Sequence, residues 1–331
     1  MRATASSARS KMRELTINTN DAGQRLDKFL SKTLKDLPPA LMYKLIRTKK
    51  IKVNRKRAEG NQMLVAGDTL QLFISDEFFG GGQNDDEALG RIVPRLSVVY
   101  EDDNIILLNK RPGVLVHEDD EGQSNTLALH LKAYLYQKGE YDPRGEQSFA
   151  PALCNRIDRN TGGIVIAAKN AASLRDMNER IREGQVRKFY LCAVHGIPKK
   201  RQARLDGWLL KNEKTKTVTI YDGEDHPKGA KQVALKYRVM AERGGNSLLE
   251  VELLTGRTHQ IRAQMAHIGH SLLGDGKYGV NREDRKEGYV HQALYSYKLR
   301  FDFSSDGHLS YLSGREYQLP KEEIWFIKDF E

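Results

Sequence analysis

The sequence has few cysteines, no long hydrophobic run and no secretory leader pattern. Two of its 331 residues are cysteine, Cys154 and Cys192, which is typical of a reducing compartment and excludes a disulfide-dense fold. No apolar stretch approaches the roughly 20 residues that a membrane-spanning helix needs. The first 14 residues are basic and serine-rich but hold no apolar segment, which argues against a secretory signal. We therefore expect a soluble cytoplasmic protein that does not bind membranes.

The sequence also lacks a pattern of metal ligands. Five of its nine histidines lie in segments with other polar residues, but none has a cysteine or carboxylate at the spacing of a metal site. We therefore expect no metal ion. The histidines concerned are His117, His259, His267, His270 and His291.

Positive charge is abundant but confined to one part of the chain. The net charge is +10, and residues 1–75 alone carry 16 Lys and Arg against 6 Asp and Glu. The remaining residues are therefore electrically balanced. This asymmetry indicates a module that binds a polyanion, joined to a near-neutral body. Basic residues scattered over a surface would instead be an ordinary solvated face.

The basic residues follow a short pattern of helices and strands. Apolar residues at helical spacing predict a helix over 24–34, and Pro39 can begin a second helix over 39–50. Residues 51–57 and 66–74 read as strands, with a basic turn after the first. We predict that this small α/β module binds a polyanion through a basic set made of Arg25, Arg47, Lys49, Lys50, Lys52, Arg55, Lys56 and Arg57.

A change in composition predicts where the domains divide. Residues 76–95 combine three glycines with acidic and amide residues, which is typical of a linker. We expect a flexible tail over 1–12, the basic domain over 13–75 and a larger domain over 96–331. Strand-like runs outnumber helices in the last of these, and several have one polar face. The predicted fold is α+β, with a mixed, largely antiparallel sheet.

Five segments of the body are candidates for chemistry. The most unusual is NRIDRNTGG, in which Asp158 stands between Arg156 and Arg159 just before an apolar strand. Taken alone, this stretch is more typical of a turn whose Asp accepts bonds from backbone amides. The other four segments are LNKRPGVLVH (108–117), RKFYLCAVHG (187–196), LLTGRTHQIRAQMAHIGHSLLGDGKYG (253–279) and HQALYSYKLRF (291–301).

Together these segments resemble the RluA-type pseudouridine synthases, which share all five in this order. The central motif of that family reads H-R-L-D-x-x-T-S-G, and the chain departs from it at Asn155, Ile157 and Gly162. Asn155 removes any titratable role at its position, Ile157 keeps the bulk of leucine, and Gly162 is expected to loosen the turn. Residues 24–74 resemble the small RNA-binding domain named after ribosomal protein S four. The two resemblances imply that the domain over 13–75 binds RNA through its basic set and that the domain over 96–331 is catalytic.

The resemblance implies a role for three residues. Asp158 would be the catalytic nucleophile, Tyr190 would stack on the uracil and assist proton movement at carbon five, and Arg262 would pair with the aspartate. A nearby arginine favours the charged carboxylate, which burial disfavours. We expect Thr258 to cap the helix that carries Arg262.

Two further arginines could assist the extrusion of a base from its stack in folded RNA. Arg156 could fill the space that the flipped base vacates, and Arg257 could contact backbone phosphate. Isomerisation of uridine involves no redox step and no transferred group, so we expect no cofactor.

The sequence thus predicts a monomeric enzyme that isomerises uridines in structured RNA, with large-subunit ribosomal RNA as the expected substrate. Transfer RNA is the nearest alternative. A catalytically idle RNA-binding factor for ribosome assembly, or an N-glycosidase that stops after bond cleavage, are alternatives from other classes. Analysis of the product separates them.

Overall fold

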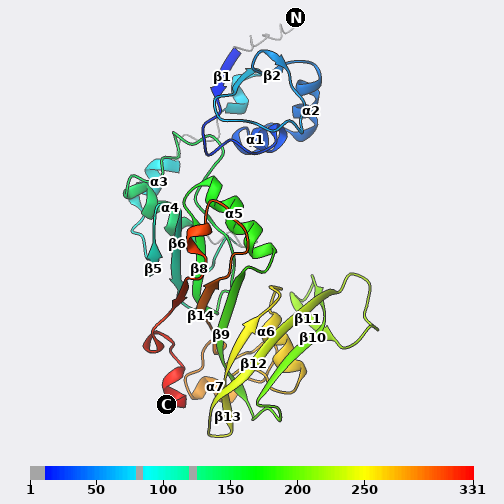
Figure 1. The fold of residues 1–331 in the computed structure, drawn as a ribbon, viewed down its shortest axis with the longest axis vertical. Coiled ribbons are helices and arrows are strands. Elements are labelled where there is room, and N and C mark those ends of the chain that lie inside the picture. The colour runs from blue at the N-terminus through cyan, green and yellow to red at the C-terminus, as the bar shows by residue number, and fades with distance from the viewer. Residues whose placement is uncertain (1–11, 80–84, 119–124) are drawn as a thin grey trace, which may run out of the picture. The chain divides into compact units, whose positions relative to one another are not determined.

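The computed structural model describes residues 12–79, 85–118 and 125–331, and these form two compact units (Figure 1). Each unit has its own apolar core. The chain passes between them more than once. The first unit comprises Met1–Pro94, Leu131–Pro151 and Lys169–Ala172, and the second comprises Arg95–His130, Ala152–Ala168 and Ser173–Glu331.

The first unit combines two helices with a small antiparallel sheet. Helix α1 (Leu26–Thr33) buries its apolar stripe, including Phe29 and Leu30, and α2 (Pro39–Arg47) has proline at its start as predicted. Both helices share one core with the strands. The strand order is β1-β4-β2-β3, with β1 at Met12–Thr16, β2 at Ile51–Val53, β3 at Lys56–Arg57 and β4 at Thr69–Phe73.

A tight turn presents the basic residues between β2 and β3. Asn54 and Arg55 both have positive φ, at 51° and 64°, which is the geometry of a two-residue hairpin turn. The Asn54 side chain stabilises the turn by donating to Asp68 at 2.7 Å and accepting from the Thr69 N–H at 2.9 Å. Arg55, Lys56 and Arg57 are consequently exposed at the tip.

The segment predicted as a linker contains regular structure. A 3₁₀ turn covers Asp76–Phe79 and helix α3 covers Asp85–Arg91. Residues 131–151 also return to the first unit, where the Ser148 hydroxyl and N–H donate to buried Asp21. The predicted domain boundaries stay a prediction, and the predicted tail lies outside the described residues except for Met12.

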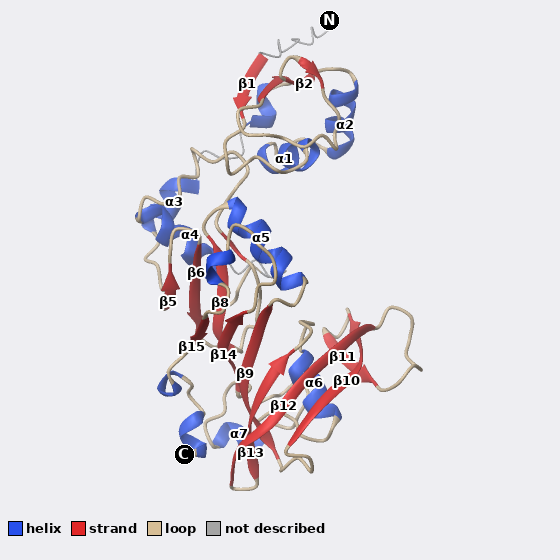
Figure 2. Cartoon of the chain, in the orientation of Figure 1, coloured by secondary structure: helices blue, strands red, loops and turns tan. Residues whose placement is uncertain are grey.

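A large sheet organises the second unit (Figure 2). Its strand order is β11-β10-β12-β13-β9-β14-β8-β6-β5, with β15 beside β14 and β7 beside β8. Within the described residues β8 and β14 pair in parallel and the other neighbours are antiparallel. The predicted α+β fold with a largely antiparallel sheet is therefore confirmed. The strands are β5 Val98–Glu101, β6 Ile105–Lys110, β7 Ala152–Leu153, β8 Gly162–Ala168, β9 Val186–His195, β10 Gln202–Asn212, β11 Thr217–Tyr221, β12 Lys231–Arg243, β13 Asn246–Leu253, β14 Leu294–Phe301 and β15 Glu316–Gln318.

The apolar patterns of the strands explain their places in this sheet. Strands β6 and β8 are continuous runs of buried residues, as expected for central strands covered on both faces. Strand β10 begins with alternating burial, which indicates one face open to water. The helices are α4 Leu127–Gln137, α5 Ala171–Arg182, α6 Gln260–His267 and α7 Arg282–Lys286, with 3₁₀ turns at Ser310–Leu312, Lys321–Glu323 and Ile327–Phe330.

Packing of α6 against the sheet fixes the residues that line the site. Ala263 of α6 packs against Val218 and Val233 of strands β11 and β12. Helix α5 turns the fully buried side chain of Met177 toward the main core. Across the described parts of the chain, no helix is long and apolar enough to cross a membrane.

Candidate active site

Asp158 lies in a turn between β7 and β8, at the edge of a cavity of about 280 Å³. The Thr161 N–H donates to the Asp158 carbonyl at 3.0 Å, which closes the turn. Asn155 fixes the turn from the other side, because its side-chain oxygen accepts the Ile166 N–H at 2.8 Å. The Asp158 side chain is 24% exposed, so a substrate in the cavity can reach it.

The glycines after this turn permit close contact with β14. A Cβ atom on Gly162 would lie 2.2 Å from the Tyr295 ring, and one on Gly163 would lie 2.2 Å from the Ser296 carbonyl oxygen. Both distances are far below contact, so glycine is needed where β8 passes β14. The expectation that Gly162 loosens the turn is wrong, since the residue allows tight packing instead.

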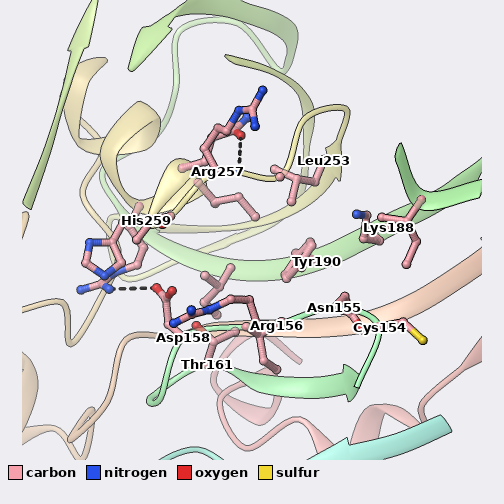
Figure 3. A pocket seen from close by; sticks show the side chains of 18 residues that line it. Cys154, Asn155, Arg156, Asp158, Thr161, Lys188, Tyr190, Leu253, Arg257 and His259 are labelled. Carbon is pink, nitrogen blue, oxygen red and sulfur yellow. Dashed lines mark hydrogen bonds and ion pairs between the residues drawn. The ribbon is translucent and has the colours of Figure 1, made fainter. Parts of the chain in front are cut away.

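Arg262 forms a buried ion triad with two aspartates. Its Nη1 donates to Asp158 at 3.0 Å, while Nε and Nη2 donate to the two oxygens of Asp275 at 2.6 and 2.8 Å. The Asp275 side chain is completely buried and Arg262 is 8% exposed. Figure 3 shows the Asp158 contact as a dashed line at one end of the cavity. Asp275 thus holds the planar guanidinium so that one nitrogen faces Asp158.

The charges of the triad stabilise one another. Burial alone lowers the pKa of Arg262, but hydrogen bonds and the charge of Asp275, together with Asp158, outweigh burial and raise it. Burial raises the pKa of Asp275, but the Arg262 guanidinium outweighs this effect and lowers it. Arg262 and Asp275 therefore remain ionised at neutral pH.

His259 precedes α6 in a left-handed conformation, with φ 55°. The helix begins at Gln260, so the expectation that Thr258 caps it is wrong. The ring nitrogen Nδ1 of His259 lies 2.8 Å from the Tyr278 hydroxyl, and that hydroxyl also accepts the Val218 N–H. The Tyr278 ring in turn lies 5.2 Å from the Arg262 guanidinium carbon. Burial lowers the pKa of His259, so a neutral ring that orders this wall of the cavity is favoured.

Tyr190 lies on β9 and lines the cavity between its two ends (Figure 3). It is 5% exposed, and burial raises its pKa to about 12 while a hydrogen bond with Ser296 opposes the rise. The phenol is therefore neutral at physiological pH. The neighbouring Phe189 packs in the apolar core, because adjacent side chains of a strand point to opposite faces.

The two remaining arginines of the predicted site also line the cavity, and both are exposed. Arg156 lies beside Asp158, whereas the guanidinium of Arg257 points away from Asp158 (Figure 3). The structure thus brings Asp158, Tyr190, Arg262, Arg156 and Arg257 to one cavity. The eight basic residues predicted in the RNA-binding module lie in the first unit, where Arg25 is paired with Asp27 at 2.5 Å.

Sequence reasoning missed Lys110 and Asp275. Lys110 is 1% exposed, and its Nζ donates to the carbonyls of Val114 and Arg159 at 2.9 and 2.8 Å, and to that of Arg111. It therefore ties segment 108–117 to the turn that carries Asp158. Both residues were present in the recognised segments as NKRPG and GDGKYG. A charged residue beside glycine or proline is also typical of an exposed turn, so the pattern gave no reason to single them out.

The fold and the site define an enzyme that places an arginine-paired carboxylate beside an aromatic ring in a cavity the size of one base. Residues 104–267 match the family model described as RNA pseudouridylate synthase. The chain is 30% identical to ribosomal large subunit pseudouridine synthase C of Vibrio vulnificus over 298 residues, covering 88% of this chain and 89% of that protein. It is 31% identical to the protein of the same name from Buchnera aphidicola, with 82% of each covered.

The chain belongs to the RNA pseudouridylate synthase family. It is an isomerase that converts uridine in RNA to pseudouridine. Solved structures agree on the fold. Human RNA pseudouridylate synthase domain containing 4 aligns with a TM-score of 0.54 at 20% identity, covering 71% of this chain and 90% of that one. Human RNA pseudouridylate synthase domain containing 1 aligns with a TM-score of 0.52 at 21% identity, covering 71% of this chain and 95% of that one.

Proposed function

We propose that this enzyme isomerises specific uridines in large-subunit ribosomal RNA, with Asp158 as its nucleophile. The names of the relatives that share more than four fifths of its length support this substrate. The observation that carries the catalytic assignment is the pairing of Asp158 with Arg262 at 3.0 Å inside the cavity. A volume of about 280 Å³ suits one extruded base rather than a stacked strand.

The proposed reaction uses side chains alone. Asp158 forms a covalent bond to the substrate as the glycosidic carbon–nitrogen bond breaks, which divides one difficult step into two. The free uracil turns while Tyr190 stacks on it, and its carbon five then bonds to the ribose. As that bond forms, Asp158 is released, carbon five then loses its proton, and the former glycosidic nitrogen takes up one proton, so the product is an isomer of the substrate. Arg262 orients the Asp158 side chain for attack through their contact at 3.0 Å.

A stacked base must first enter the cavity, and Arg156 is placed to assist. Extrusion costs a few kcal/mol, which contacts in the vacated space can offset. Arg156 is exposed beside Asp158, so we propose that its guanidinium occupies that space while Arg257 contacts phosphate at the rim.

Analysis of the reaction product tests the proposed activity against its alternatives. Purified enzyme and ribosomal RNA fragments should yield pseudouridine and no free uracil. Free uracil would indicate an N-glycosidase, unchanged RNA an idle binding factor, and modification of transfer RNA alone the other substrate. We also propose that the enzyme acts as a cytoplasmic monomer, because one chain supplies every residue placed at the cavity and the proposed substrate is ribosomal.

Replacement of Tyr190 should separate stacking from proton movement. We expect Tyr190→Ala to weaken binding of the flipped base by roughly 1–3 kcal/mol, because the stacked ring is lost. Tyr190→Phe should bind RNA normally but lose roughly 10²–10⁴ of kcat, since a neutral phenol relays a proton by accepting one as it donates its own. Single-turnover kinetics with both variants measures the two effects. Full activity of the Phe variant would remove the hydroxyl from the proton step.

The first unit should supply much of the salt-dependent affinity. We propose that it is the RNA-binding domain and that its exposed hairpin contacts backbone phosphates. Replacing Arg55, Lys56 and Arg57 with serine should lower the slope of log affinity against log salt by roughly 0.7–0.9 for each phosphate that is no longer bound. Substitution is preferable to removing residues 1–75, because residues 131–151 pack in the same unit.

The control for the hairpin variant replaces three exposed lysines elsewhere, Lys286, Lys321 and Lys328, with serine. Both proteins are titrated with salt on the same RNA, and turnover at saturating RNA is compared. The hairpin variant should keep its kcat. An unchanged salt slope would mean that the cavity and its rim bind the phosphates without the hairpin.

A further inference from the structure

The cavity has a second charged end that the proposed reaction does not use. Lys188 lines the same cavity as Asp158, and Figure 3 shows it at the end opposite Asp158 and His259, with Tyr190 between them. The amine therefore lies beyond the ring on which the base is proposed to stack.

The sheet directs this lysine into the cavity. Side chains two residues apart on a strand point to the same face, so Lys188 and Tyr190 lie together on β9. Arg187 takes the other face, where it donates to Glu252 at 2.8 Å. Strand β9 is bonded on both sides, with Lys188 opposite Leu253 of β13 and Leu299 of β14. The backbone thus holds the side chain in place.

Within the described ranges of the chain, no carboxylate or other hydrogen-bond partner contacts the Lys188 amine. It reaches the turn before α6, where a Cβ atom added to Gly256 would lie 3.8 Å from Nζ. The adjacent Cys154 thiol supplies no counter-charge, because burial raises its pKa to about 12. Lys110 is different, since three backbone carbonyls accept its amine protons.

An amine that lines a cavity and has no acidic partner there can bind an anionic group of a substrate. Burial lowers the pKa of Lys188, and no neighbouring carboxylate among the described residues opposes this shift. A bound phosphate would supply the missing charge and accept its protons. The neighbouring arginine cannot serve here, because both edges of the Arg262 guanidinium are occupied by Asp158 and Asp275.

We propose that Lys188 binds the RNA backbone phosphate on one side of the flipped uridine, an inference that rests on the proposed function. Two residues along a strand span roughly 7 Å, which is of the order of the separation between a base and its own phosphate. A uracil stacked on Tyr190 would therefore place a flanking phosphodiester at the amine. Lys188 binds the phosphate and thereby positions the nucleotide in the cavity, and it takes no part in making or breaking bonds.

The test uses a ribosomal RNA fragment that wild-type enzyme isomerises, together with copies carrying one uncharged methylphosphonate on either side of the target uridine. Turnover of the unmodified fragment by wild type checks the proposed function by itself. Lys188→Met should then weaken binding of the unmodified fragment by roughly tenfold to a hundredfold, as expected for a hydrogen bond to a charged group. Its kcat at saturating RNA should change little.

The modified fragments identify the phosphate that is bound. One of the two methylphosphonates should weaken binding to wild type but leave binding to Lys188→Met unchanged, because the interaction is already absent. Lys188→Arg should keep the wild-type salt slope, whereas Lys188→Met should lower it by roughly 0.7–0.9. Thermal unfolding should show Lys188→Met to be at least as stable as wild type, since it removes an uncompensated charge.

Two results would overturn the proposal. If Lys188→Met weakened the binding of all three RNA fragments equally, the amine would not contact a phosphate beside the target uridine. The second is a loss of kcat at saturating RNA while each methylphosphonate weakens binding by the same factor in the variant as in wild type. This result would indicate that the amine contacts the base. Failure of wild type to isomerise any ribosomal fragment would instead contradict the proposed function.

Discussion

Asp158→Asn should abolish pseudouridine formation while leaving RNA binding and the fold nearly unchanged. The amide has the shape of the carboxylate, and its oxygen can still accept from Arg262, but it cannot attack the substrate. Loss of a nucleophile in other enzymes lowers kcat by roughly 10⁴-fold or more, so we expect no product above background. Purified variant and wild type are compared for pseudouridine content of the RNA and for RNA affinity.

The control for this substitution is Asp222→Asn, which makes the same change on a side chain that is 76% exposed. It should retain full activity. Turnover by Asp158→Asn at even a few per cent of wild type would contradict the assignment of the nucleophile. Unfolding curves that coincide with wild type would show that the loss is chemical.

Arg262→Met should remove both activity and stability. Methionine occupies similar space but leaves the fully buried Asp275 without its partner, and breaking a buried pair costs about 3–5 kcal/mol. Catalysis should also be lost, since nothing then orients Asp158. Denaturant unfolding measures the first effect and product formation measures the second. Arg257→Met, on an exposed side chain of the same cavity, should change stability by less than about 1 kcal/mol.

A double variant separates the two effects of Arg262→Met. Adding Asp275→Asn removes the buried charge, while the amide oxygen can still accept the N–H groups of Lys277 and Tyr278. Stability should be partly restored and activity should not, because Asp158 still lacks its partner. Restoration of activity together with stability would show that Arg262 acts only through the fold.

The central residues could be predicted because their segments are local and ordered. The five motifs indicated Asp158, Tyr190 and Arg262 without knowledge of the fold, and the structure places all three at one cavity. On β9, the alternation of side chains places Tyr190 at the cavity and Phe189 in the apolar core. The apolar strands β6 and β8 could also be predicted from the sequence, because a central strand that is buried on both faces is a continuous run of apolar residues.

Contacts across the sheet could not be predicted in this way. The need for Gly162 depends on the Tyr295 ring, which lies on a strand more than 130 residues away in the sequence. The His259 ring likewise contacts the hydroxyl of Tyr278, and Asp275 becomes a partner of Arg262 only when a turn folds back onto α6. Spacing along the chain carries no information on which side chain occupies such positions.

The most direct test is a map of pseudouridines in RNA from cells that lack this gene, complemented with wild type or with Asp158→Asn. The account predicts that specific positions in large-subunit ribosomal RNA lose pseudouridine on deletion, regain it with wild type and remain uridine with the variant. Transfer RNA should be unchanged in all strains. Large-subunit ribosomal RNA with the same pseudouridines in every strain, or positions restored by Asp158→Asn, would contradict it.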